Sequence, residues 1–221
     1  MKFRNLVFLM VMLPLFSVCQ RISYTTPENE DSRTLDFEII GKISGNFLVY
    51  KNIRNHYAIS IYDNDMGLKE RVPLDFLPDK TLNTDFISYP DFAYIIYQYQ
   101  KRSILHCMAV KIDGNGKKLG EPVELDTTHI GAFADNKIYN VVNSEDKQKI
   151  MIFKIQKKYD KFSFKTLLFN SQLQIQHTSR IQMSYEERRD VFSDFFVDND
   201  GIFIFAKSIK GGNRELISKL F

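Results

Sequence analysis

Acidic turn residues are the first candidates for chemistry in this chain. Asp63 and Asp65 lie in one short turn signal, and Asp198 and Asp200 lie in another. Carboxylates at this spacing supply oxygen ligands of the kind that Ca²⁺ prefers. Neither segment has the later ligands or the terminal Glu of a complete calcium loop, and Asp-Gly and Asn-Gly pairs also suit tight hairpins. We therefore interpret both segments as plain turns and predict no metal site.

The histidines form no recognisable metal or catalytic motif. They are spread over four separate segments, as His56, His106, His129 and His177. No two of them have the His-x-x-x-His spacing of a local zinc site. Asp126 stands three positions before His129, and a carboxylate beside an imidazole can serve acid–base chemistry. A loop before a strand explains the same residues, so we predict no catalytic residue and no cofactor.

The cysteine at position 107 is the remaining nucleophile of interest. His106 and Cys107 are neighbours in a strand-like run, so their side chains should point to opposite faces of a sheet. They cannot form a simple pair of nucleophile and base, and we expect Cys107 to be a small core residue. The chain also has no Gly-x-Ser-x-Gly elbow and no glycine loop that would cradle a phosphate.

Four residues are our candidates for ligand binding. Tyr97 and Tyr99 share one face of a predicted strand, where exposed tyrosines stack on sugar rings or anchor a protein partner. Packing inside the sheet is the competing interpretation, because Tyr97 also recurs as a repeat position. Glu186 and Arg189 lie in a charged segment between two predicted units. Mixed charges of this kind are also typical of a solvated surface.

The elements that must position these residues are four pairs of short strands rich in aromatic and β-branched residues. Such residues fit a pleated, half-buried surface, and the chain has 19 Phe, 11 Tyr and no Trp. The two strands of each pair are separated by a polar loop of similar length. Their first-strand anchors are Tyr50, Tyr97, Tyr139 and Phe205, and their second-strand anchors are Tyr62, Ile112, Ile155 and Leu220.

Further strand-like runs turn each pair into a larger unit. The runs LDFEIIGKI, TDFISY, HIGAFA and VFSDFFV precede the pairs, and ERVPLDF and GEPVELD follow the first two. Turn residues separate the runs, so the unit is an antiparallel meander of four strands. We assign the strand from Phe162 to Phe169 to an insertion in the third unit. Even spacing of short strands predicts an all-β, β-propeller-like fold of about four blades over residues 35–221, with the fourth unit incomplete.

The N-terminus has the layout of a secretory signal peptide over residues 1–19. Lys2 and Arg4 precede an apolar run over residues 6–16, which is too short for a comfortable membrane span. Cleavage after Cys19 competes with lipidation that would make Cys19 an anchored first residue. Residues 20–34 are polar and read as an extended lead-in. We expect an exported protein of the periplasm, outer-membrane surface or extracellular space, without a transmembrane segment after signal removal.

Charge and cysteine usage narrow the classes of partner. The formal net charge is +3, and without the two cations of the signal it is +1. That balance is too even to steer the protein to nucleic acid. If Cys19 leaves with the signal, Cys107 is the remaining cysteine, so no intramolecular disulfide forms and the core must supply the stability.

Four stretches of the chain carry a resemblance to known sequences, and they are DFISYPDFAYIIYQYQKRSILHCMAVKIDGNGKKL, EPVELDTTHI, VNSEDKQKIMIFKIQKK and ERRDVFSDFF. These stretches resemble uncharacterised exported β-propeller-like proteins of Bacteroidetes-type bacteria. The resemblance covers most of the mature chain and implies a propeller-like fold. The relatives continue past the point at which this chain ends, so it resembles a C-terminally shortened member. No catalytic residue can be carried over, because the matching stretches specify no activity.

The sequence thus favours a binding or scaffold protein of the cell envelope, with an envelope protein or a glycan as its partner. This functional step depends on analogy between folds, because propellers host many unrelated functions. The alternatives are an envelope hydrolase or lyase with a pocket at the blade centre, and a truncated product without independent function. An enzyme requires acidic groups, or a histidine and an acid, that converge in one concave site.

Overall fold

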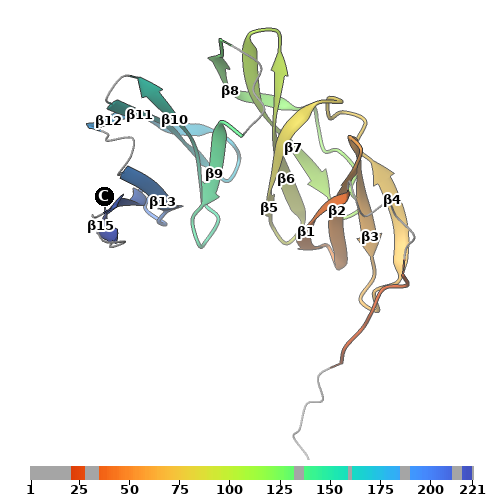
Figure 1. Cartoon of the computed structure of the whole chain (residues 1–221). Helices are drawn as coiled ribbons and strands as arrows, with labels where there is room; N and C mark the ends of the chain where they lie inside the picture. Colours follow the sequence, from red (N-terminus) through yellow and green to blue (C-terminus); the bar gives the residue numbers. More distant parts are fainter. Residues whose placement is uncertain are drawn as a thin grey trace, which may run out of the picture.

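Every regular element that the structure describes is a β-strand. The computed structural model describes residues 21–27, 35–131, 137–158, 161–184, 190–210 and 216–220. Its fifteen strands form four separate sheets in which all neighbours are antiparallel (Figure 1). We call these sheets blades 1 to 4. The predicted all-β, propeller-like fold is confirmed.

Blades 1, 2 and 3 have four strands each, and blade 4 has three described strands. Blade 1 comprises β1 (Leu35–Ile43), β2 (Asn46–Ile53), β3 (His56–Tyr62) and β4 (Leu68–Pro73). Blade 2 comprises β5 (Thr81–Ser88), β6 (Phe92–Lys101), β7 (Ile104–Asp113) and β8 (Val123–His129). Blade 3 comprises β9 (Tyr139–Asn143), β10 (Lys149–Lys158), β11 (Lys161–Asn170) and β12 (Ile175–Ser184). Blade 4 comprises β13 (Asp190–Val197), β14 (Phe203–Lys210) and β15 (Leu216–Leu220).

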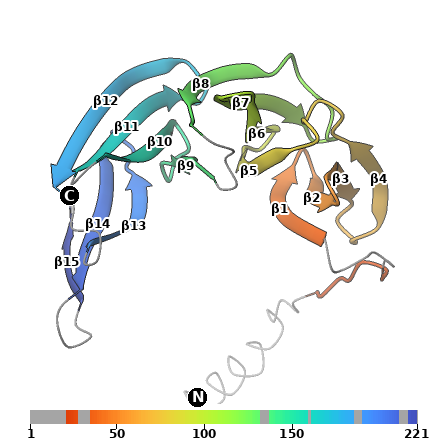
Figure 2. The same cartoon turned by 45° about the horizontal axis from the view of Figure 1, so that its top comes forward.

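The blades stand side by side along an open arc. Within each blade the strands pair in chain order, so each blade is a meander. Figure 2 shows the first strands β1, β5, β9 and β13 toward the inside of the arc, and β4, β8 and β12 along its outside. First strands of neighbouring blades approach one another, β1 with β5 and β9 with β13. Blades 1 and 4 form the two ends of the arc.

The hydrophobic core lies between the blades rather than inside a single sheet. Middle strands such as β7 are apolar on both faces because each face packs on a different neighbour. Ile59 and Ile95 lie between blades 1 and 2, and Leu105 and Ile152 lie between blades 2 and 3. Phe153 packs between blades 3 and 4. Each blade therefore depends on its neighbours for burial, as expected for a repeat protein.

One hydrogen-bonded turn recurs between the third and fourth strands of blades 1, 2 and 3. Its first residue, Asp63, Asp113 or Asn170, accepts the backbone N–H groups two and four positions later. Its fourth residue is left-handed in every copy, as Met66, Gly116 or Leu173. Asp198 begins the same turn between β13 and β14, with Gly201 in the left-handed position. The acidic turn residues thus have a structural role, which agrees with the plain-turn interpretation.

The third unit differs from the sequence-based prediction. Tyr139 begins β9, the first strand of blade 3, whereas Tyr50, Tyr97 and Phe205 all lie in second strands. The strand over Phe162–Phe169 is part of β11, so it is the regular third strand of blade 3 and not an insertion. In the HIGAFA run, His129 ends β8 and residues 132–136 lie outside the described part of the chain.

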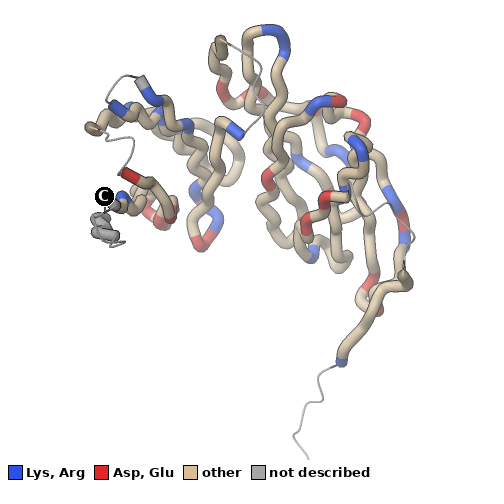
Figure 3. The backbone as a smooth tube through the Cα atoms, in the orientation of Figure 1, with Lys and Arg blue, Asp and Glu red and all other residues tan. Residues whose placement is uncertain are grey.

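The predicted N-terminal features remain predictions. Residues 1–20 and 28–34 lie outside the described residues, and residues 21–27 have no regular secondary structure. In the ranges that the structure describes, we find no helix with the length and hydropathy of a membrane span. Acidic and basic residues are interspersed on all four blades (Figure 3).

Candidate functional site

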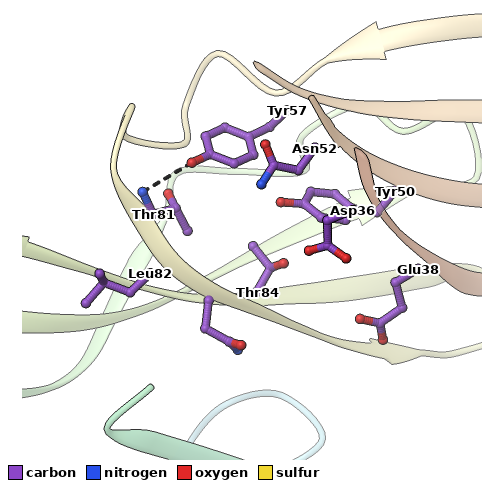
Figure 4. A pocket seen from close by; sticks show the side chains of 9 residues that line it. Asp36, Glu38, Tyr50, Asn52, Tyr57, Thr81, Leu82 and Thr84 are labelled. Atoms are coloured by element: carbon purple, nitrogen blue, oxygen red, sulfur yellow. Dashed lines mark hydrogen bonds between the residues drawn. The ribbon is translucent and has the colours of Figure 1, made fainter. Parts of the chain in front are cut away.

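A polar pocket opens between the first strands of blades 1 and 2, on the inner side of the arc. It has a volume of about 160 Å³. Figure 4 shows its side chains arriving from β1, β2, β3 and β5. The lining residues are Asp36, Glu38, Tyr50, Asn52, Tyr57, Thr81, Leu82, Asn83 and Thr84.

The acidic side of the pocket comes from the pleat of β1. Successive side chains of a strand point to opposite faces, so Asp36 and Glu38 face the pocket while Phe37 and Ile39 face away from it. Neither carboxylate forms a hydrogen bond or a salt bridge with another residue that the structure describes. Both groups are therefore available to a ligand.

Burial and nearby charges shape the ionisation of Glu38 and of the neighbouring Asp85. Burial raises the pKa of Glu38, and the nearby charges of Asp85 and Asp36 raise it further, while Lys137 opposes the shift. Burial also raises the pKa of Asp85, against hydrogen bonds from Lys137 and Asn83. The Nζ atom of Lys137 lies 2.6 Å from Oδ1 of Asp85. The pocket thus concentrates negative charge that is only partly compensated.

Two tyrosines form the opposite wall. The rings of Tyr50 and Tyr57 stack with centroids 6.4 Å apart and planes 11° apart, and Phe86 supports Tyr50 from blade 2 with centroids 5.0 Å apart. The hydroxyl of Tyr57 donates to the carbonyl oxygen of Asp79 and accepts the N–H of Thr81, both at 3.3 Å. Burial raises the pKa of Tyr50 to about 12, so its hydroxyl stays protonated at neutral pH.

The pocket therefore combines carboxylate acceptors, amide and hydroxyl donors and aromatic surface around a small cavity. Asn52 is held in place because its Oδ1 accepts the N–H of Asn55 at 3.0 Å. A cavity of about 150 Å³ is large enough for one six-membered ring. Convergent polar groups beside aromatic walls are typical of a site for a small polar ligand. The arrangement suits a ring that carries several hydroxyl groups.

The two sequence candidates that the structure describes, Tyr97 and Tyr99, do not line this pocket. Tyr97 is 3% exposed and packs between blades 1 and 2, with its ring stacked against Tyr99 at 6.3 Å. Tyr99 is half-buried, and its ring stacks on His106 at 4.9 Å. Glu186 and Arg189 lie outside the described residues.

Asp126 belongs to a different polar cluster, between blades 2 and 3, rather than to a pair with His129. Its Oδ1 lies 2.7 Å from the Nζ of Lys165, and its Oδ2 lies 2.9 Å from the Nζ of Lys154. The hydroxyl of Tyr139 donates to the same Oδ2 at 2.9 Å. Burial alone would raise the pKa of Asp126, but the hydrogen bonds from Lys165, Lys154 and Tyr139 outweigh it and lower the pKa. The cluster joins the two blades.

Cys107 and His106 lie on opposite faces of β7, as expected. Cys107 is fully buried between blades 2 and 3, and burial raises the pKa of its thiol. His106 faces blade 1, and its Nδ1 lies 2.7 Å from Oε2 of Glu124. Asp190 is also engaged, at 2.7 Å from the Nζ of Lys207. Cys107 is the direct cross-strand partner of Asp126, whereas His106 lies on the opposite face of β7 from both of them.

A second cavity, of about 470 Å³, lies between blades 2 and 3. Its polar groups already hold the blades together, because Tyr89 donates to the carbonyl of Lys147 and Tyr94 donates to that of Ser171. The Nζ of Lys111 lies 3.7 Å from the centre of the Phe92 ring in its wall. We therefore regard the pocket between blades 1 and 2 as the better candidate site.

Comparison with known proteins gives no family assignment. No family model and no curated protein matches the chain. Among solved structures, an endo-arabinase from Bacteroides thetaiotaomicron VPI-5482 is 12% identical with a TM-score of 0.43, covering 90% of this chain and 78% of that one. The catalytic domain of the Coprinopsis cinerea GH62 α-L-arabinofuranosidase is 11% identical with a TM-score of 0.37, covering 79% of this chain and 67% of that one.

The Nup133 β-propeller domain of Vanderwaltozyma polyspora is 10% identical with a TM-score of 0.35, covering 84% of this chain and 54% of that domain. These likenesses are too distant to support an argument about function. The assignment of the fold therefore depends on the strand order of the four sheets, and any assignment of function depends on the pocket.

Proposed function

We propose that this protein is an exported binding protein of the cell envelope and that it holds a single sugar ring of a glycan in the pocket between blades 1 and 2. The observation that carries this proposal is the convergence of Asp36, Glu38, Asn83 and Thr84 on one small cavity beside Tyr50. Carboxylates accept hydrogen bonds from vicinal hydroxyl groups, and amides and hydroxyls both donate and accept. Tyrosine rings supply an apolar surface for the C–H faces of a sugar.

A binding experiment on wild type and pocket variants tests this proposal. A panel of monosaccharides and short oligosaccharides is titrated against the protein and followed by calorimetry. We expect at least one member to bind, and Asp36→Asn to weaken that binding by roughly tenfold, because a hydrogen bond to a charged acceptor is lost. Glu70→Gln is the matched control, since Glu70 is exposed on β4 of the same blade, away from the pocket. Equal affinity in Asp36→Asn and wild type would contradict the assignment.

Hydrolysis of a glycosidic bond is a second candidate function, because of the ionisation of Glu38. A general acid needs a raised pKa, and the pKa of Glu38 is raised by burial and by two neighbouring carboxylates. Glycosidases use two such carboxylates, one as an acid and the other as a base or nucleophile. The roles here would fall to Glu38 as the acid and Asp36 as its partner.

Hydrolysis of a chromogenic glycoside distinguishes a glycosidase from a sugar-binding protein. We expect a panel of 4-nitrophenyl glycosides to release nitrophenol if the pocket is catalytic, and Glu38→Gln to lower that rate by at least about 100-fold. Binding of the intact sugar should survive in Glu38→Gln, because glutamine keeps one acceptor and adds donors. Binding without turnover in the wild type favours the binding protein.

A further inference from the structure

The end of the arc formed by blade 1 presents an apolar sheet face. Phe37 and Ile39 of β1 are 60% and 67% exposed. With Phe47 and Val49 of β2 they line a groove of about 500 Å³ on the side of blade 1 opposite to blade 2. We call this surface the outer face of blade 1. Contiguous exposed apolar surface of this kind marks an interaction site.

The other end of the arc is apolar as well. Val191 and Phe196 of β13 are 40% and 50% exposed, and Ile202, just before β14, is 59% exposed. They lie on the side of blade 4 away from blade 3, because Phe195, Val197 and Phe203 occupy the side that packs on Phe153. We call this surface the outer face of blade 4.

Both outer faces match the chemistry of the interfaces inside the arc. Between blades 1 and 2, a phenylalanine of a first strand, Phe86, packs on Tyr50 of the preceding blade. Between blades 3 and 4, Phe195 of a first strand packs on Phe153 of the preceding blade. Phe37 is the counterpart of these two residues in the first strand of blade 1 and is 60% exposed, and the outer face of blade 4 offers it the exposed apolar side chains of Val191, Phe196 and Ile202.

We propose that two copies of this chain pair head to tail, with the outer face of blade 4 of one copy on the outer face of blade 1 of the other. A surface pocket and a complementary apolar surface elsewhere on the same molecule form a heterologous contact. Because the blades already curve into an arc (Figure 2), two such contacts related by a two-fold axis close a ring. Among the described residues, the outer face of blade 4 supplies an apolar surface that complements this groove, which favours a second copy as its occupant.

Light scattering coupled to size-exclusion chromatography tests the proposal on protein obtained by expressing the full sequence. We expect a particle with twice the mass of one chain that dissociates on dilution. Placing lysines on either face should weaken self-association by roughly 100-fold, because a charge replaces buried apolar surface. The two variants are Phe37→Lys with Ile39→Lys on blade 1, and Phe196→Lys on blade 4. Ile175→Lys is the control, since Ile175 is 57% exposed on β12, away from both end faces.

Mixing the two variants identifies the geometry. Each variant keeps one intact face, so an equimolar mixture should recover a two-chain particle through a single native contact, although neither variant pairs by itself. Circular dichroism of each variant confirms that its sheets remain folded. A wild type that stays monomeric at every concentration would overturn the proposal. So would pairing that Phe196→Lys leaves unchanged, since that result assigns the contact to two blade 1 faces, and so would unlimited growth of the particle in place of a two-chain limit.

Discussion

At the scale of single residues, the molecule places its charges in two contrasting environments. Asp36 and Glu38 lie beside one another in a pocket without a described ion-pair partner. Asp126, in contrast, is held by Lys154 and Lys165 between two blades. Uncompensated acids are typical of sites that bind or react, whereas compensated ones are typical of structural contacts. This difference separates the candidate site from the polar cluster that supports the fold.

Glu38→Gln should raise the stability of the protein slightly while it alters the site. The folded state raises the pKa of Glu38, so the charged form disfavours folding at neutral pH. Because the side chain of Glu38 is only partly buried, solvent screens the effect, and the gain should stay below about 0.5 kcal/mol in the free energy of unfolding. Urea denaturation at pH 7 measures it. A clear loss of stability would show that Glu38 has a structural partner.

Asp126→Asn should destabilise the protein by about 2 kcal/mol, because Lys154, whose side chain is 5% exposed, would keep its charge without a counter-ion. Urea denaturation at pH 7 measures the loss. Glu121→Gln is the control, since it removes only the exposed contact with Lys118 and should change the free energy by less than about 0.5 kcal/mol. A loss no larger than that of the control would mean that the cluster contributes nothing to folding.

The effect of Asp126 should also depend on pH. The pKa of Asp126 is lower in the folded protein than its ordinary value of 3.8, so its stabilising effect is complete above that value. The effect disappears as the pH falls through the lower folded pKa. Denaturation midpoints of wild type and Asp126→Asn should therefore converge in acid, and a constant difference down to about pH 2 would contradict this assignment.

At the scale of elements, the strands with strong local signals were predictable. The run LDFEIIGKI coincides with β1, and the turn residues before β2 and β14 lie where expected. In LDFEIIGKI, acidic residues alternate with apolar ones, which predicts that Asp36 and Glu38 share one acidic face of the strand. The partners Tyr57, Asn83 and Thr84 come from other strands. No local sequence pattern could predict that these residues line one pocket with Asp36 and Glu38, because their proximity depends on how blade 2 packs on blade 1.

The sequence-based prediction assigned the strands of blade 3 wrongly, and the reason lies in one of its turns. Its turn from β11 to β12 begins at Asn170 and puts Leu173, not glycine, in the left-handed position. Without the Asp-Gly signature the turn is not recognisable in the sequence. The sequence-based prediction matched the units by their aromatic residues and so grouped Tyr139 with residues of second strands. In the structure Tyr139 lies in β9, a five-residue strand that is the first of its blade.

The recurring turn gives a test at this scale. Gly116 has φ of +68°, a conformation that costs an L-residue about 1 kcal/mol or more. We therefore expect Gly116→Ala to lower the free energy of unfolding by about 1 kcal/mol, as measured by urea denaturation. Gly131→Ala is the matched control, since no atom lies within 4 Å of the added methyl group. Equal stability of the two variants would argue against the turn geometry.

At the scale of the whole molecule, stability should follow position along the arc. Blades 2 and 3 pack on neighbouring blades at both faces, whereas in the described part of the chain blades 1 and 4 each pack on one neighbouring blade. In a repeat protein the free energy of local opening reflects the number of such interfaces. The end blades should therefore open more readily than the middle ones.

Hydrogen exchange followed by mass spectrometry tests this gradient. Measured on the variant with lysines at positions 37 and 39, so that pairing of copies does not contribute, amides of β6, β7 and β10 should exchange more slowly than those of β2 and β14. The expected difference is at least tenfold, since an additional buried interface adds more than about 1.4 kcal/mol to the free energy of opening. Uniform exchange over all blades would instead indicate a single cooperative unit.

The burial of Cys107 makes the seam between blades 2 and 3 observable. The thiol is sealed in that seam and its pKa is raised by burial, so a maleimide or a disulfide reagent reaches it only when the two sheets part. The rate at which Cys107 is alkylated in native buffer therefore reports how often blades 2 and 3 separate. Protein in which Cys107 reacts at the rate of a free thiol has already lost the middle of its arc.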